Sequence, residues 1–267
     1  MAAHSAPRSG GAGYPMTEGR IYEPAVVRLS SREKLGRTAA RDIAAAIRTG
    51  LQNQAGLRIL FASAPSQEAT LRALVEEPEI DWTRVTAFHL DEYLGLPPDS
   101  PQRFGNWLNT VLFDQVPVGA VHLMEPGQDV QEGMAQYRAL LTSAPIDILC
   151  LGIGVNGHLA FNDPPAEFDT SDVLRVVELD DVSRQQQVDD CCFSRLADVP
   201  REALTVTVPT LLSARRIFCM VPGRAKRDAV RRALRGPVTP DMPASALRKH
   251  PDCTIYVDSE SAPDEVA

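Results

Sequence analysis

Short apolar runs alternate along the chain with longer stretches of helical periodicity. Runs of strand length occur at residues 57–63, 84–90, 146–151, 174–179, 203–208, 216–221 and 254–257. The segments between them predict helices at residues 30–50, 66–77, 103–113, 130–141, 182–196 and 224–235. Apolar strands separated by crossover helices are typical of a mostly parallel sheet that is covered on both faces. The pattern therefore predicts a doubly wound α/β fold of Rossmann-like architecture.

The first predicted helix begins with a capping signal. Ser30 is followed three residues later by Glu33, a spacing typical of a capping box, and the Ala-rich run ends at Gly50. With 267 residues, 44% of them hydrophobic, the chain can bury one sizeable core. We expect a single catalytic α/β domain over residues 20–258. A disordered tail at residues 1–19 and a C-terminal tail at residues 259–267 are expected to flank it.

Charge and cysteine content disfavour several classes of function. A net charge of -8 argues against nucleic-acid or anionic-membrane partners, because both require clustered basic surface. No apolar run is long enough to span a membrane, and the first 20 residues lack a signal-peptide core. The five cysteines are odd in number and lack CxxC spacing, which favours a reducing compartment. We therefore expect a cytoplasmic protein with a small-molecule partner, and a homo-oligomer is left open.

Three loops after predicted strands, at residues 62–67, 91–97 and 152–158, hold the most unusual chemistry. In open α/β sheets ligands bind beyond the carboxyl ends of the strands, so these loops are expected to form one cleft. Successive strand side chains point to opposite faces, and only one of Asp91 and Glu92 is expected to enter that cleft. A carboxylate there could abstract a proton from carbon. A helix cap or a solvated loop start is the alternative.

His158 lies in a glycine-rich loop, where tight turns allow close approach of a ligand. Histidine is the usual proton shuttle near neutral pH. Asn156 and Asp163 flank it in sequence, and an Asp beside the imidazole would fix its tautomer and support its charged form. A purely structural, hydrogen-bonded histidine is the alternative.

The sequence does not support a cofactor site or a metal site. Gly152, Gly154 and Gly157 have the spacing of G-x-G-x-x-G, but proline-bearing loop sequence follows them where a dinucleotide-binding motif would open a helix. The sequence contains no HExxH, paired-Cys or clustered-His pattern. We therefore expect neither a metal nor a cofactor.

Residues 224–235 are strongly basic and contain one acid, Asp228. A solvated helix face explains most of these charges. Lys226 differs because it lies in the first turn after Pro222 and Gly223, where a helix N-terminus and an ammonium group together favour an anion. We expect Lys226 to bind an anionic group of the substrate.

Two longer motifs are specific: Phe-His-Leu-Asp-Glu-Tyr-Leu-Gly-Leu-Pro at residues 88–97 and Leu-Gly-Ile-Gly-Val-Asn-Gly-His-Leu-Ala-Phe-Asn-Asp-Pro at residues 151–164. Through them the chain resembles the glucosamine-6-phosphate deaminase family, and the likeness runs from about residue 21 to residue 257. The resemblance implies an aldose–ketose isomerase and deaminase that needs no cofactor. Its substrate would be glucosamine 6-phosphate or a close relative, and its products fructose 6-phosphate and ammonia.

The resemblance also implies roles for particular residues. Asp91 would be the base that moves a proton between carbons 2 and 1, and His158 the ring-opening group, with Asn156 and Asp163 as its supports. Together with the argument for Lys226, the substrate-binding residues are expected to be Ser63, Ala64, Ser66, Gln67, Gly154, Arg184 and Lys226.

The site departs from the family pattern in the residues around the histidine. The family usually has an acid at the position of Asn156, although some members have asparagine, and Glu at the position of Asp163. An amide cannot take a proton, so His158 and Asp163 would have to suffice.

The phosphate loop departs further. Pro65 lacks a backbone N–H, and Ala64 allows fewer turn geometries than glycine, although nearby serine hydroxyls remain. After Arg184, an arginine expected at the phosphate is replaced by Asp189. Phosphate recognition is where the chain differs most from the family.

Two other functions compete with deamination. A sugar-lactone hydrolase like 6-phosphogluconolactonase would share the fold, but such enzymes tend to follow the histidine with Thr-Ala-Ser, and this chain has Leu-Ala-Phe at residues 159–161. A sugar-phosphate sensor without turnover would not need both Asp91 and His158. The sequence favours the deaminase.

Overall fold

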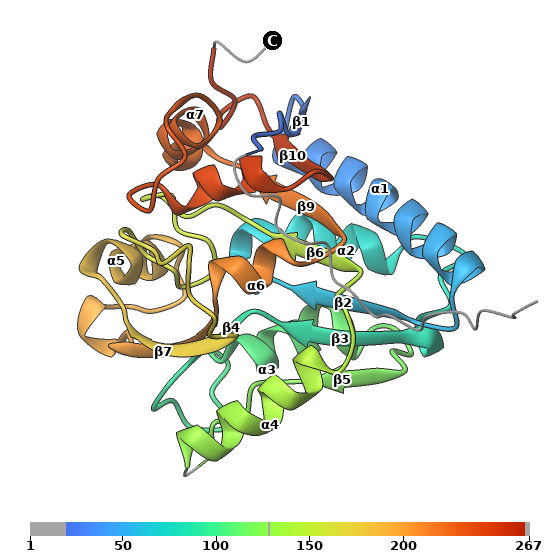
Figure 1. Cartoon of the computed structure of the whole chain (residues 1–267), viewed down its shortest axis with the longest axis horizontal. Coiled ribbons are helices and arrows are strands. Elements are labelled where there is room, and N and C mark those ends of the chain that lie inside the picture. Colours follow the sequence, from blue (N-terminus) through green and yellow to red (C-terminus); the bar gives the residue numbers. More distant parts are fainter. Residues whose placement is uncertain (1–19, 128, 265–267) are drawn as a thin grey trace, which may run out of the picture.

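The computed structural model describes residues 20–127 and 129–264, and the tail expected at residues 1–19 lies outside them. Within the described residues the central layer is a seven-stranded parallel sheet with the order β1-β10-β9-β6-β2-β3-β5 (Figure 1). Its strands are β1 (Ala25–Arg28), β2 (Leu57–Phe61), β3 (Val85–His89), β5 (Ala120–His122), β6 (Ile148–Leu151), β9 (Arg216–Val221) and β10 (Cys253–Val257). The predicted parallel α/β sheet is confirmed.

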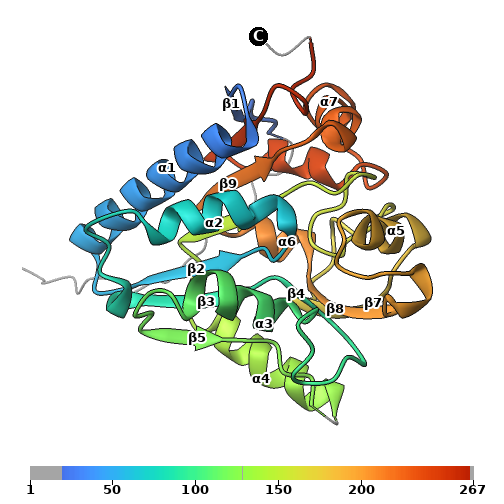
Figure 2. The ribbon, with the colours of Figure 1, turned by 180° about the vertical axis from the view of Figure 1, so that it is seen from behind.

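Helices cover both faces of this sheet because neighbouring residues of each strand point to opposite sides. On β2, Ile59 belongs to the core on one face and Leu60 to the core on the other. Figure 2 shows the first face, covered by α1 (Arg32–Asn53), α2 (Glu68–Val75) and α3 (Phe104–Leu108), which continues as a π-helix at Asn109–Phe113. The second face is covered by α4 (Val130–Thr142), α6 (Val208–Leu212) and α7 (Arg227–Arg235).

A second sheet of three strands lies beside the first in the described part of the chain, with the order β4-β8-β7. Its strands are β4 (Asp91–Tyr93), β7 (Leu174–Glu178) and β8 (Glu202–Val206), and both pairings are antiparallel. The sequence predicted β7 and β8 as strands but placed them in the parallel sheet, and that placement was wrong. An apolar run identifies a strand without identifying its partner.

The chain passes between the two sheets at Leu90. Its N–H donates to the carbonyl of Phe61 in β2 (3.2 Å), and its carbonyl accepts from the N–H of Val206 in β8 (2.8 Å). Leu90 therefore joins both sheets, and Asp91 immediately after it is the first residue of the small one. This step places a polar strand directly at the carboxyl edge of the large sheet.

Several predicted bounds need correction. The N-cap of α1 is Ser31, whose hydroxyl accepts from the N–H of Lys34, and not Ser30. The helix α5 (Asp181–Asp189) ends before residue 196 because Cys191 adopts a positive φ of 61° and turns the chain away. The short elements β1, β5 and α6 were not predicted at all.

The remaining turns are 3₁₀ helices at Pro65–Gln67, Trp82–Arg84, Leu196–Asp198, Arg224–Lys226 and Pro243–Lys249. Residues 259–264 pack against the fold: Ser261 is fully buried, and Arg227 donates to the carbonyl of Glu260 (2.9 Å). None of the helices in the described ranges combines the length and apolar character needed to cross a membrane.

Candidate active site

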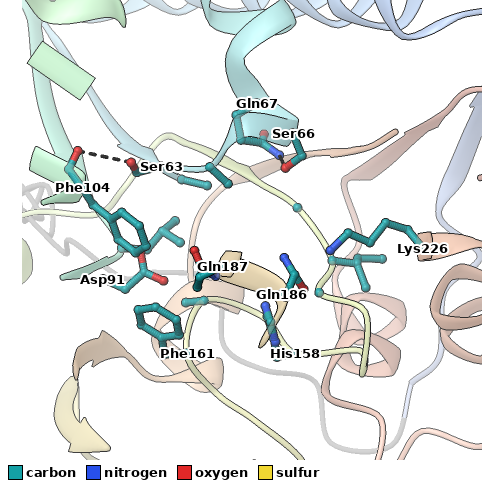
Figure 3. Close-up of a pocket in the computed structure, with 17 residues that line it drawn as sticks. Ser63, Ser66, Gln67, Asp91, Phe104, His158, Phe161, Gln186, Gln187 and Lys226 are labelled. Carbon is teal, nitrogen blue, oxygen red and sulfur yellow. Dashed lines mark hydrogen bonds between the residues drawn. The ribbon is translucent and has the colours of Figure 1, made fainter. Parts of the chain in front are cut away.

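A solvent-open pocket of about 500 Å³ lies at the carboxyl ends of β2, β6 and β9 (Figure 3). All three loops singled out from the sequence contribute to its wall, as expected for an open α/β sheet. Of the residues expected at the site, those that line the pocket are Ser63, Ala64, Ser66, Gln67, Asp91, Gly154, His158 and Lys226.

Asp91 presents a buried carboxyl group to this pocket. It pairs with Thr205 across the small sheet, and only 6% of its surface is exposed. The aromatic rings of Phe104 and Phe161 line the same wall (Figure 3). Burial raises the pKa of Asp91 well above its usual value, and the neighbouring charge of Glu92 raises it further. A carboxylate with a raised pKa is a stronger base, which suits proton abstraction near neutral pH.

Glu92 points the other way, as strand alternation predicts. Its carboxylate is fully buried and accepts the N–H groups of Tyr93 (2.9 Å), Phe104 (3.0 Å) and Gly105 (3.0 Å). The Nε atom of Arg103 lies 3.6 Å from it. Glu92 therefore fixes the start of α3 and, through it, the position of Phe104 in the pocket wall.

Side chains outside the pocket wall contact the Nδ1 side of the His158 ring. Its Nδ1 lies 3.2 Å from Oδ1 of Asp163 and 2.9 Å from Oγ of Ser183. Asn156 donates to the same Asp163 oxygen (3.0 Å) and accepts from the backbone N–H of His158 (3.0 Å). Burial by itself would raise the pKa of Asp163, but its hydrogen bonds with these three residues outweigh burial and lower it. Asn156 and Asp163 thus contact the histidine and do not line the pocket.

The loop expected to bind phosphate is braced by its own side chains. Ser63 Oγ donates to the carbonyl of Phe104 (3.2 Å). The Gln67 amide donates to Ser66 Oγ (3.0 Å) and to the carbonyl of Met220 in β9 (3.1 Å). Pro65 begins a 3₁₀ helix, a position at which an N–H has no partner within the helix. The proline therefore costs the helix itself no hydrogen bond.

Lys226 supplies a positive charge to the described pocket wall (Figure 3). Its side chain is 7% exposed, and burial lowers its pKa to about 8, although the carboxylate of Asp190 opposes this shift. The ammonium group is therefore charged at neutral pH and only lightly hydrated, which strengthens its attraction for an anion.

Arg184, for which the sequence predicted a substrate contact, does not line the pocket. Its guanidinium donates to the carbonyls of Leu196 (2.7 Å) and Val199 (3.1 Å) and to Asp181 (2.9 Å). Asp189 is exposed and accepts a hydrogen bond from the side-chain amide of Gln185, one turn earlier in α5. Neither Arg184 nor Asp189 lines this pocket.

Three polar residues of α5 belong to the site although no sequence motif pointed to them. Ser183, Gln186 and Gln187 are all buried, and the two glutamines line the pocket (Figure 3). Gln186 also accepts the backbone N–H of Val155 (3.0 Å). The three recur at positions i, i+3 and i+4, so they share one helix face. A polar stripe on a helix with few apolar residues was the signal that could have revealed them.

No group of three or more His, Cys, Asp and Glu side chains in the described ranges is placed to hold a metal ion. The pocket instead joins a buried carboxyl, an imidazole and an ammonium group at the carboxyl edge of a parallel sheet. These features define a Rossmann-like α/β enzyme whose own side chains can carry acid–base chemistry on a small anionic substrate.

Comparison with known proteins identifies the family. Residues 30–256 match the family described as glucosamine-6-phosphate isomerases/6-phosphogluconolactonase. The chain is 31% identical over 238 residues to glucosamine-6-phosphate deaminase of Enterococcus faecalis, covering 89% of this chain and 98% of that protein. It is 38% identical over 209 residues to the deaminase of Rhodopirellula baltica, covering 76% and 82%.

Solved structures agree with this assignment. A monomeric glucosamine-6-phosphate deaminase superposes with a TM-score of 0.80 at 30% identity, covering 89% of this chain and 98% of that one. A 6-phosphogluconolactonase from Trypanosoma brucei reaches a TM-score of 0.75 at 19% identity, covering 92% and 100%, and shares the fold. This chain belongs to the glucosamine-6-phosphate isomerase/6-phosphogluconolactonase family, which confirms the resemblance seen in its sequence.

Proposed function

We propose that the protein is a glucosamine-6-phosphate deaminase, which converts glucosamine 6-phosphate and water to fructose 6-phosphate and ammonia. The observation that carries the proposal is the sharing of one pocket by Asp91, His158 and Lys226. The similarity to curated deaminases over most of the chain supports the same reaction.

In the proposed reaction His158 opens the sugar ring. It takes the proton of the carbon-1 hydroxyl and returns a proton to the ring oxygen, which gives the open-chain aldehyde. Asp163 contacts the imidazole during this step, and Asn156 holds the backbone of His158 and the carboxylate of Asp163.

Asp91 then removes the proton from carbon 2 and delivers it to carbon 1, through an enediol-type intermediate. The carbon-1 oxygen takes up a proton that the amino group gives up as it becomes a ketimine at carbon 2, and one water molecule then hydrolyses the ketimine to the ketone and ammonia. The raised pKa of Asp91 matches a base that must hold and return one proton.

Lys226 is the proposed main contact of the phosphate, and the hydroxyls of Ser63 and Ser66 are further candidates. The backbone of Ala64 would allow the sugar to approach closely, Gly154 makes room for the ring of His158, and Gln67 braces the loop. Among these groups Lys226 carries the one positive charge, because the guanidinium of Arg184 donates to the carbonyls of Leu196 and Val199.

One assay tests the proposal. Purified protein is incubated with glucosamine 6-phosphate, galactosamine 6-phosphate and the free amino sugars, and ammonia is measured. Hydrolysis of 6-phosphogluconolactone is measured in parallel, because the family includes lactonases. We expect ammonia from glucosamine 6-phosphate above all. Lactone hydrolysis without ammonia release would contradict the proposal, and so would ligand binding without any turnover.

We also infer a cytoplasmic setting. The five cysteines all lie in described positions, and all five are free thiols, as a reducing compartment maintains them. The assembly state is left to measurement, and light scattering distinguishes a monomer from a homo-oligomer.

A further inference from the structure

Ser183 has a hydroxyl group between the imidazole of His158 and the carboxylate of Asp163. The residue is fully buried in the first turn of α5. Its Oγ lies 2.9 Å from Nδ1 of His158 and donates a hydrogen bond to Oδ1 of Asp163. No role for this serine follows from the sequence motifs of the site.

The direction of these hydrogen bonds follows from the number of protons available. A serine hydroxyl carries one proton, and an ionised carboxylate can only accept. The lowered pKa of Asp163 keeps it ionised at neutral pH, so the hydroxyl proton points to Asp163. Ser183 Oγ can then only accept from His158, which requires a proton on Nδ1. The 3.2 Å approach of Asp163 Oδ1 to Nδ1 requires the same proton.

The hydroxyl of Ser183 is held in place by the start of its helix. Asp180, the N-cap of α5, accepts the backbone N–H of Ser183 (2.7 Å) through Oδ1. Its Oδ2 accepts from the amide of Asn156 (3.2 Å), which also donates to Asp163. The helix start and the support of His158 therefore form one connected network.

The opposite edge of the imidazole faces the pocket (Figure 3). With the proton on Nδ1, the neutral ring has its lone pair on Nε2. The ring itself packs against the backbone of Gly154, another residue of the pocket wall. Because His158 lines the pocket while its Nδ1 faces Asp163 and Ser183, Nε2 is the nitrogen on the pocket side.

We propose that Ser183 is a positioning residue that, together with Asp163, fixes the Nδ1–H tautomer of His158 and so makes Nε2 the proton acceptor. The catalytic part of this inference rests on the proposed role of His158 in ring opening, whereas the tautomer itself does not. Asn156 cannot substitute for the hydroxyl as an acceptor, because its amide oxygen already accepts the backbone N–H of His158 and its nitrogen can only donate.

The direct test is ¹⁵N NMR of the histidine side chains, with the His158 signals assigned by their loss in His158→Gln. At a pH where the ring is neutral, we expect the wild type to hold its proton on Nδ1. Ser183→Ala is expected to shift the ring towards a mixture of tautomers. Ser183→Cys keeps nearly the same volume with a weaker donor, so it serves if the alanine variant folds poorly.

Kinetics provide the second measurement. We expect Ser183→Ala to lower kcat for the closed-ring substrate by about tenfold or more, the equivalent of one lost hydrogen bond, with a much smaller change in KM. An open-chain analogue should be slowed less. Ser261→Ala is the matched control for loss of a buried hydroxyl, because Ser261 is equally buried and accepts the N–H of Asp258 instead of contacting His158.

The outcomes separate this inference from the proposed function. A proton on Nε2 in the wild type, or an unchanged Nδ1–H tautomer in both Ser183 variants, would overturn the role of Ser183. Equal slowing of closed-ring and open-chain substrates would overturn its link to ring opening. A protein with the expected tautomer shift but no ammonia release would support the role of Ser183 and overturn only the deaminase.

Discussion

The imidazole of His158 rests directly against the backbone of Gly154: a Cβ atom at this glycine would lie 2.2 Å from Nε2. The turn cannot open freely, because the N–H of Gly154 donates to the carbonyl of His158 (3.0 Å). We predict that Gly154→Ala displaces the ring and lowers kcat/KM roughly 100-fold, as a misplaced catalytic group does. Steady-state kinetics check this, and the melting temperature shows whether the fold is kept. Full activity in the variant would contradict the geometry.

Asp91→Asn tests the assignment of the base. Removing the carboxylate should slow exchange of the carbon-2 proton with deuterated solvent by roughly 10²- to 10⁴-fold. Ligand binding should stay within about tenfold of wild type, because the carboxylate acts on the transition state. Both are measured on the same preparation, by NMR exchange and by calorimetry with a non-reacting analogue. Equal losses in exchange and binding would assign Asp91 to binding.

Glu92→Gln tests how the neighbouring charge tunes Asp91. The base works when deprotonated, so kcat/KM falls as the pH drops through the raised pKa of Asp91. Removing the like charge at Glu92 should lower the pKa of Asp91 and move the acid limb of the pH profile to lower pH. A limb that stays in place would show that burial alone sets this pKa. The melting temperature serves as the control, since Glu92 also accepts three N–H groups.

The lowered pKa of Lys226 leads us to predict that substrate binding depends on pH. Burial lowers its pKa to about 8, so the ammonium charge is present below that pH and is lost above it. KM for glucosamine 6-phosphate should therefore rise as the pH passes through about 8. Lys226→Met should raise KM by about tenfold at pH 7 and remove that rise. Unphosphorylated glucosamine is the control substrate, and an equal effect on it would assign Lys226 to another part of the sugar.

Arg184→Ala separates a structural role from a substrate contact. The change leaves the carbonyls of Leu196 and Val199 without their donor, which should cost about 1.5–3 kcal/mol in the free energy of unfolding. KM should change less than about twofold. Denaturant unfolding and KM are measured together. A large rise in KM without loss of stability would show that Arg184 contacts the substrate.

The large sheet could be predicted from the sequence because each of its longer strands is an apolar run of strand length. The run at residues 216–221 became β9 without any change of bounds. The strand β4 is different: it has three residues, Asp91 to Tyr93, and two are acids. Burial of such a strand depends on partners distant in sequence, such as Glu92 with the start of α3. No local pattern specifies those partners.

The candidate site could be predicted in the loops that follow β3 and β6, where Asp91 and His158 lie. It was not predictable on α5, because a helix presents different faces to different neighbours. Arg184 and Ser183 are adjacent in sequence, yet one meets the loop at residues 196–199 and the other meets His158. One step along a helix turns a side chain by about 100°, so the sequence alone could not tell which of the two reached the site.

The chain passes from the large sheet to the small one at Leu90, so the two sheets have different roles. Most of the apolar burial belongs to the large sheet and its helices, whereas Asp91 takes its orientation from three short antiparallel strands. A shift of those strands would re-aim Asp91, and it would also move the loop after His158, because Phe161 and Asn162 donate to Thr205 and Val206 of β8. The small sheet therefore couples the position of the carboxyl group to that of the imidazole.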